Sequence, residues 1–179
     1  MNIFYIDENP VQAAKAMVDK HVVKMILETA QILSTAHRVM DGEMAIEKSK
    51  SGRSVKRWKL HDERENLLYK ATHINHPSAV WVRESIENYN WALEHLVALC
   101  AEYTHRYNKV HKCWCTLTFP LGTPPWNLKE HGFTPPPCAM PEEYVVENNA
   151  LQSYRNYYSK GKANLHAWKK RQPPDWLVI

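Results

Sequence analysis

Residues 9–41 read NPVQAAKAMVDKHVVKMILETAQILSTAHRVMD and contain no glycine, and no proline after Pro10. Asn9 can cap a helix whose first residue is Pro10, and Gly42 can end it after Asp41. We therefore expect one helix of about eight turns. Apolar and small side chains recur along it every three or four residues and predict its buried face: Val18, Val22, Met25, Thr29, Ile32 and Ala36.

A second stripe of polar side chains follows the same predicted helix. Its members lie one turn apart, so their side chains form a column on one side: His21, Lys24, Glu28, Gln31, Thr35 and Arg38. The stripe is either an ordinary solvated face or one wall of an active site. An imidazole, an ammonium group, a carboxylate and an amide in line make the second interpretation worth testing.

The composition describes a globular chain of 179 residues, with 44% hydrophobic and 23% charged residues. Its length is sufficient for one domain with a core, and we expect residues 1–179 to form a single compact domain. No apolar run approaches the ~20 residues that span a bilayer, and the N-terminus does not resemble a signal peptide. We expect a cytoplasmic protein with reduced cysteines and no membrane partner. The net charge of +4 permits a polyanionic partner.

The remaining elements complete an all-α prediction. Residues 78–107 form a second long helix, because apolar side chains including Tyr89, Leu96 and Cys100 recur at helical spacing. This stripe should pack against the first helix. A short extended N-terminus, a short helix, a proline-rich ordered strap and a shorter C-terminal helix are expected at residues 1–7, 60–72, 108–141 and 143–159 respectively.

Two segments are rich in lysine and arginine. Residues 42–59 are expected to form a mobile loop, and residues 160–179 an aromatic tail with Trp168 and Trp176. Each segment is either a plain solubilising surface or a phosphate-binding one. The candidate phosphate contacts are Arg53, Lys56 and Arg57 in the loop, Lys169, Lys170 and Arg171 in the tail, and Arg155 on the C-terminal helix.

The sequence lacks the motifs of several other kinds of functional site. Cys113 and Cys115 are separated by one residue rather than the two of a zinc knuckle, and no second knuckle follows. The sequence also lacks a glycine-rich phosphate loop and a Gly-x-Ser-x-Gly elbow. We therefore predict no metal and no cofactor.

Glu28 follows His21 by seven residues, which nearly restores the same direction around a helix, so both should project into one site. A carboxylate can act as a general base or stabilise a developing cation. Lys24 lies between them and could serve as a nucleophilic amine if desolvated, and Asp19 could orient His21. Gln31 and Arg38 would extend the same wall toward the substrate.

The pattern Asp19-Lys20-His21, followed by six residues and Glu28, resembles the pyrimidine-dimer DNA glycosylase family of the phage endonuclease V type. The order of parts is similar too: an extended N-terminus, a central helix, a long helix containing ALCAEYTHRYNK, then YRNYYSKGK and an aromatic basic tail. The whole chain also looks like small proteins of large tailed phages. The resemblance implies an all-α fold, a DNA substrate and the cytoplasm of an infected bacterium as the place of action.

The resemblance also implies roles for individual residues. Glu28 would be the catalytic carboxylate, His21 would hold the flipped-out nucleotide or its phosphate, and Trp81 or Trp91, with Asn88 on the same face, would line the extruded base. The family's nucleophile is the amine of a small N-terminal residue exposed after Met removal. The start Met1-Asn2 departs from that pattern, which leaves the nucleophile and the lyase reaction open.

Two other functions fit the same residues. A phage enzyme that transfers groups onto modified pyrimidines would also need base flipping, a basic surface and a general base. A helical module that binds nucleic acid or a host protein without catalysis would tolerate replacement of Glu28. Release of a base would indicate the glycosylase, a gain in base mass would indicate the transferase, and neither change would indicate the non-catalytic module.

Overall fold

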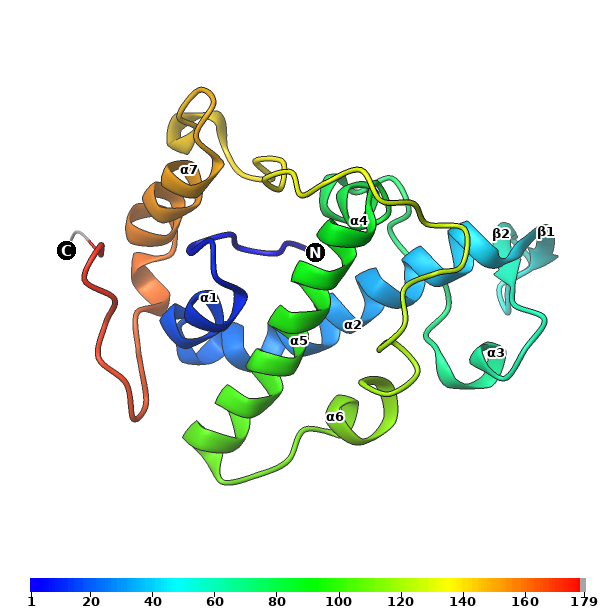
Figure 1. Cartoon of the computed structure of the whole chain (residues 1–179), viewed down its shortest axis with the longest axis horizontal. Helices are drawn as coiled ribbons and strands as arrows, with labels where there is room; N and C mark the ends of the chain where they lie inside the picture. The colour runs from blue at the N-terminus through cyan, green and yellow to red at the C-terminus, as the bar shows by residue number, and fades with distance from the viewer. Residues whose placement is uncertain (178–179) are drawn as a thin grey trace.

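A computed structural model describes residues 1–177 and shows a mostly helical fold with one small sheet (Figure 1). The helices are α1 (Pro10–Ala16), α2 (Asp19–Asp41), α3 (Arg64–Leu67), α4 (Pro77–Val82), α5 (Ile86–Tyr107), α6 (Lys112–Leu117) and α7 (Ala150–Asn156). Single turns of other helical types lie at Glu142–Tyr144, Tyr157–Gly161 and Ala163–Leu165. The strands β1 (Glu43–Lys48) and β2 (Ser54–Lys59) form an antiparallel hairpin.

Helices α2 and α5 pack against each other and form the centre of the fold, with α1 against α5 (Figure 1). The predicted core stripe is confirmed, because all six of its side chains are buried, five on α2 and Val18 directly before it. Tyr89, Leu96 and Cys100 of α5 are buried as expected. The N-terminal residues Ile3 to Ile6 also enter this core, as the apolar start of the chain predicts.

The prediction of one helix over residues 9–41 is wrong, because the helix is interrupted at Met17 and Val18, both of which are extended. Asn9 caps α1 as predicted, and its side chain accepts hydrogen bonds from the backbone N–H groups of Val11 and Gln12 at 2.9 and 3.1 Å. The predicted stop at Gly42 is also confirmed. A Cβ there would crowd the carbonyl oxygen of Arg38, which explains why glycine suits this position.

The second long helix is interrupted as well. Residues 78–107 divide into α4 and α5 at Arg83–Ser85, because the Ser85 hydroxyl accepts a hydrogen bond from the backbone N–H of Asn88 at 3.1 Å and starts a new helix. The Asn88 side chain then donates back to the carbonyl of Trp81 at 3.1 Å. The end of α5 at Tyr107 agrees with the prediction.

Three further predictions need correction. The basic segment 42–59 is a regular hairpin rather than a loop, with a turn in which Gly52 has a φ of 79°. Helix α6 lies inside the segment expected to be irregular, although its remainder, residues 118–141, does form a strap anchored by the buried Leu121 and Leu128. The C-terminal helix spans Ala150–Asn156 instead of residues 143–159.

Candidate active site on helix α2

The carboxylate of Glu28 lies on α2 next to two amines. Its Oε1 is 3.2 Å from Nζ of Lys24, one turn earlier, and its Oε2 is 3.9 Å from the α-amino nitrogen of Met1. The Glu28 side chain is 15% exposed and that of Lys24 is 66% exposed, so the carboxylate borders solvent without being surrounded by it. An amine beside a shielded carboxylate is an arrangement that can perform nucleophilic or acid–base chemistry.

The side chain of Asn2 fixes the N-terminus in this position. Its carbonyl oxygen accepts hydrogen bonds from the backbone N–H groups of Ile3 and Phe4 at 2.7 and 3.2 Å. Its amide donates to the carbonyl of Ala139 in the strap at 2.8 Å, and the Tyr154 hydroxyl donates to Oδ1 of Asn2 at 3.1 Å. Contacts with both the strap and α7 therefore hold the α-amine beside Glu28 rather than leaving it on a free chain end.

The charges of the same cluster influence His76, at the start of α4. His76 caps α4, where its Nδ1 accepts a hydrogen bond from the backbone N–H of Ser78 at 3.2 Å. Burial lowers the pKa of His76; the α-amine of Met1 and His73 lower it further, whereas Glu28 opposes them. The charges of the Met1 α-amine and of Glu28 thus both act on the His76 ring, with opposite effects on its pKa. Only the fold places the start of α4 against α2, so spacing along the chain does not indicate that His76 and Glu28 influence each other.

A family model supplies the comparison. The pyrimidine dimer DNA glycosylase model matches residues 1–114, which include Glu28, the N-terminal segment, His76 and the hairpin. The chain belongs to this family. No curated protein and no solved structure matches the chain. The resemblance drawn from the motif on α2 is thus confirmed, and a DNA glycosylase-like function and a DNA substrate follow at the level of the family.

The structure does not join His21 to Glu28. The two residues are two turns apart, or about 10 Å along the helix. His21 is 5% exposed, its ring stacks on Phe4 with ring centroids 4.4 Å apart, and its Nδ1 lies 2.9 Å from the Tyr158 hydroxyl. Burial lowers its pKa to about 4, with Lys162 and Lys24 adding to the effect. The expectation that His21 grips a phosphate is corrected: it is neutral and positions the N-terminal segment through Phe4.

The far end of the polar stripe is also closed. Arg38 is 2% exposed and donates to the carbonyls of Tyr69, Trp58, Leu68 and Glu65 and to the Glu65 carboxylate. Thr35 donates to the carbonyl of Gln31 and bonds to the backbone of Thr72. Arg38 therefore has a structural role, and Gln31, half-buried one turn after Glu28, remains the candidate on this side.

Asp19 and the tail form a separate, structural cluster around Arg106. This guanidinium is fully buried and contacts Asp19 at 2.9 Å and Glu102 at 2.7 Å. It also donates to the carbonyls of Lys15 and Met17, at the interruption between α1 and α2. Asp19 thus orients no catalytic histidine, and this part of the prediction is corrected.

Two of the three predicted phosphate-binding side chains of the tail, those of Arg171 and Lys170, bond to other groups of the molecule, whereas Lys169 is exposed and bonds through its backbone. Arg171 donates twice to Glu102, at 3.0 and 2.9 Å. The Lys170 ammonium donates to the carbonyl of His105 and to the Asn108 side chain, and the backbone N–H of Lys169 donates to Asp19. These contacts dock the tail on α5, which is the alternative that the sequence left open.

Three more predicted DNA contacts lie in the interior, and a fourth, Arg155, is half-buried. Trp81, Asn88 and Trp91 are buried; Trp81 and Trp91 donate from their indoles to the carbonyls of Thr134 and Glu8. Arg155 donates to the carbonyl of Ile6 and pairs with Asp7 at 3.6 Å. Trp81, Asn88 and Trp91 present no free surface, so the structure corrects their assignment to base stacking or DNA binding, whereas Arg155 is half-buried and its predicted DNA contact stays a prediction. Aromatic and polar residues on a helical face look alike whether the face meets a ligand or a neighbouring segment.

The remaining predicted cations lie on the hairpin, at the C-terminal end of α2 (Figure 1). Arg53 is exposed in its turn, and Lys56 is exposed on β2. Arg57 is half-buried and pairs across the hairpin with Ala45, so it points to the opposite face from Lys56.

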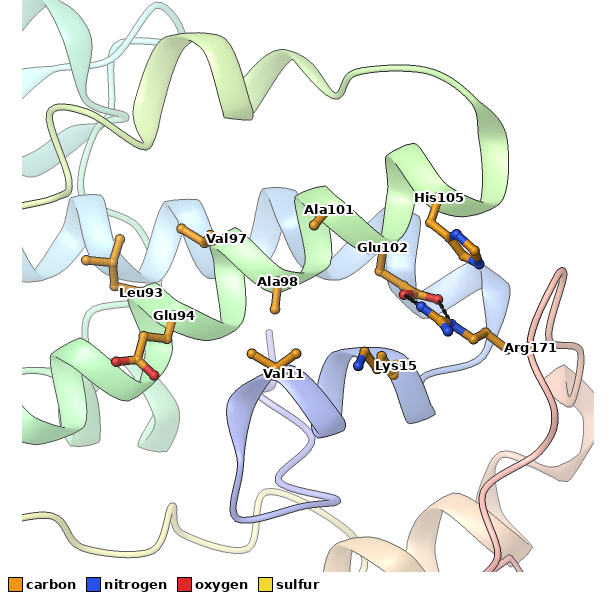
Figure 2. Close-up of a pocket in the computed structure, with 10 residues that line it drawn as sticks. All are labelled: Val11, Lys15, Leu93, Glu94, Val97, Ala98, Ala101, Glu102, His105 and Arg171. Carbon is orange, nitrogen blue, oxygen red and sulfur yellow. Dashed lines mark hydrogen bonds and ion pairs between the residues drawn. The ribbon is translucent and has the colours of Figure 1, made fainter.

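A large cavity lies elsewhere, between α1 and α5 (Figure 2). Its volume is about 670 Å³ and its lining is mostly apolar, with Val11, Leu93 and Val97 among the residues. Of its two carboxylates, Glu94 is exposed at one end and Glu102 is tied to Arg171 and Arg106. The cavity therefore offers no buried, unpaired acid or base, and the chemistry is better placed at Glu28.

Two negative findings concern the described residues 1–177. No three His, Cys, Asp or Glu side chains gather there in a manner that could hold a metal ion. None of the helices is both long enough and apolar enough to cross a membrane.

Proposed function

We propose that the chain is a DNA glycosylase that removes a damaged pyrimidine, with Glu28 as its catalytic carboxylate. One observation carries the proposal: a shielded carboxylate, the α-amine of Met1 and the Lys24 amine meet at one point of α2. Membership of the pyrimidine dimer DNA glycosylase family supports the choice of reaction. The transferase and the non-catalytic module have no comparable support.

The chemistry assigned to these groups is displacement at C1′ of a deoxyribose. An amine nitrogen attacks C1′, the glycosidic C–N bond breaks, and the base departs with the bonding electrons and takes up a proton. The attached nitrogen then loses one proton, the bond between C1′ and the ring oxygen breaks to give an iminium ion, the ring oxygen takes up a proton, and Glu28 stabilises the positive charge that develops.

Two amines compete for the role of nucleophile. The α-amine of Met1 is the better candidate because Asn2, the strap and α7 hold it in place, and its surroundings are more enclosed than those of Lys24. The Lys24 side chain is 66% exposed, and no contact with other segments of the described chain holds it in a fixed position toward a substrate. In this assignment Lys24 contacts the phosphate next to the reacting nucleotide.

The test is excision of a cyclobutane pyrimidine dimer from a defined duplex, measured in single turnover. Glu28→Gln removes the charge and keeps the shape, so the rate should fall by roughly 10²–10⁴-fold while duplex binding persists. Glu94→Gln, an exposed carboxylate on α5, serves as the matched control and should retain the wild-type rate. A fully active Glu28→Gln protein would refute the assignment.

Borohydride trapping identifies the nucleophile. Reduction of the iminium ion links the protein to DNA, and peptide mapping by mass spectrometry locates the link. We expect it on the N-terminal residue, with trapping retained in Lys24→Ala. A link on Lys24, lost in that variant, would exchange the two roles.

A further inference from the structure

The hairpin β1–β2 is unusual because almost none of it is buried. All six residues of β1 are exposed, including Met44 and Ile46, which are 48% and 69% exposed. A two-stranded sheet with both faces in water gains little stability from burial. A contribution to the hydrophobic core therefore does not explain why this segment forms a regular hairpin.

The charges of the hairpin are sorted between its two faces. Side chains alternate along a strand, so the register of the strands assigns each residue to a face. One face contains both acids and their cross-strand partners: Glu43 opposite Lys59, Ala45 opposite Arg57, and Glu47 opposite Val55. The other contains cations and apolar side chains with no acid: Met44 opposite Trp58, Ile46 opposite Lys56, and Lys48 opposite Ser54.

We propose that this acid-free face is a DNA-binding ribbon that lies in a groove of the duplex, with Lys48 and Lys56 on phosphates and Ile46 against the groove. The inference rests on the proposed function for its choice of polyanion. A two-stranded ribbon fits the major groove of B-DNA, and lysines beside an exposed apolar side chain suit the combination of phosphates and base edges found there. Lys50 and Arg53 in the exposed turn extend the positive surface beyond the strands.

The position of the ribbon fits a duplex that also reaches Glu28. The hairpin begins directly after α2, and residues 28 and 41 are about 20 Å apart along that helix. The segment after the hairpin returns along α2: Arg38 bonds to Leu68, Thr35 bonds to Thr72, and α4, which His76 caps, packs against α2. Lys70 and His73 are exposed on this segment. At 3.4 Å per base pair, the ribbon would meet the duplex roughly six base pairs from the reacting nucleotide.

Fluorescence anisotropy with a duplex containing one pyrimidine dimer tests the ribbon. The double variant Lys48→Ala/Lys56→Ala should weaken binding and reduce the slope of log affinity against log salt by about 2, one for each phosphate contact. The control Arg57→Ala/Lys59→Ala removes the same charge from the other face and should change the slope by less than half as much. Equal effects of the two variants, or no effect of the first, would overturn the inference.

Two further measurements make the test independent of catalysis. Ile46→Ser should lower affinity without altering the salt slope, because it removes an apolar contact; unchanged affinity would exclude the groove contact. Duplexes shortened to about four base pairs on one side of the lesion should abolish the difference between wild type and Lys48→Ala/Lys56→Ala. Two duplexes are compared, one shortened on each side of the lesion. If the variant binds more weakly than wild type on both of them, the ribbon contacts DNA elsewhere.

The outcomes separate this inference from the proposed function. A ribbon variant that excises at the wild-type maximal rate when saturated, but binds more weakly, supports both. If the wild-type protein binds duplex in a ribbon-dependent way but excises nothing, the ribbon stands and the glycosylase assignment fails. If excision proceeds and ribbon variants bind like wild type, only the ribbon is refuted.

Discussion

Two clusters of charge on helix α2 differ in how completely they are closed. At the N-terminal end of α2, the fully buried Arg106 of α5 contacts Asp19 and Glu102 at 2.9 and 2.7 Å, and Arg171 also pairs with Glu102. Near the middle of α2, Glu28 has only a contact of 3.2 Å with an exposed lysine and one of 3.9 Å with the α-amine. The first cluster satisfies its charges internally and stabilises the fold, whereas the second leaves a carboxylate free to meet a substrate.

The largest effect on stability is expected from Arg106→Met. The substitution keeps much of the volume but leaves Glu102 buried with a single partner and frees the carbonyls of Lys15 and Met17. We expect a loss of roughly 3–5 kcal/mol in the free energy of unfolding, measured by urea denaturation. Lys20→Met, at an exposed position of α2, is the control. A loss below about 1 kcal/mol would mean that this cluster is no more important than a surface pair.

Acid should destabilise the fold through its buried histidines. Burial lowers the pKa of His21, His37 and His95 to about 4 each, against about 6.5 in the unfolded chain. Between these values the unfolded state binds more protons, so stability should fall as the pH drops from about 6.5 to 4, by up to about 3 kcal/mol per histidine. Urea denaturation at a series of pH values measures this slope.

His21 lies between the two clusters on α2, so its variant sharpens the comparison. His21→Gln cannot titrate, and it should reduce the dependence of stability on pH in the same window. An unchanged slope would show that His21 has an ordinary pKa, and that its side chain is more accessible to solvent than this structure indicates.

A smaller effect is expected from Arg171→Ala, at the edge of the closed cluster. The Arg171 side chain is half-buried, and Glu102 keeps its contact with Arg106 after the substitution. The loss in the free energy of unfolding should be about 1 kcal/mol or less. A loss as large as that of Arg106→Met would show that docking of the tail, rather than the buried pair, holds the cluster together.

The smallest change in stability is expected from Glu28→Gln. Its ion pair with the exposed Lys24 is of the kind that contributes about 0–1 kcal/mol, and the amide can still accept hydrogen bonds. Urea denaturation should therefore give a curve close to that of the wild type, even though the proposed function assigns Glu28 a large role in turnover. A loss above about 2 kcal/mol would place Glu28 among the structural charges.

Local patterns in the sequence sufficed for the elements that they concern directly. The Asn9 cap, the stop at Gly42 and the buried faces of α2 and α5 follow from short-range spacing and capping, and the structure confirms them. The motif that contains Glu28 also identified the family. These features depend on residues a few positions apart, whose relative placement a helix fixes by itself.

Only the tertiary structure decided where the first long helix breaks and which polar residues are free. The residue types at Met17 and Val18 do not indicate a break in the helix. The guanidinium of Arg106, about ninety positions later, donates hydrogen bonds to the carbonyls of Lys15 and Met17, which the interrupted helix leaves without a helical partner. The same reason separates Glu28 from Arg38 on one stripe, since the partners of each come from distant segments. Whether a charge is closed or open depends on what the rest of the chain brings to it, and spacing along one helix does not encode that.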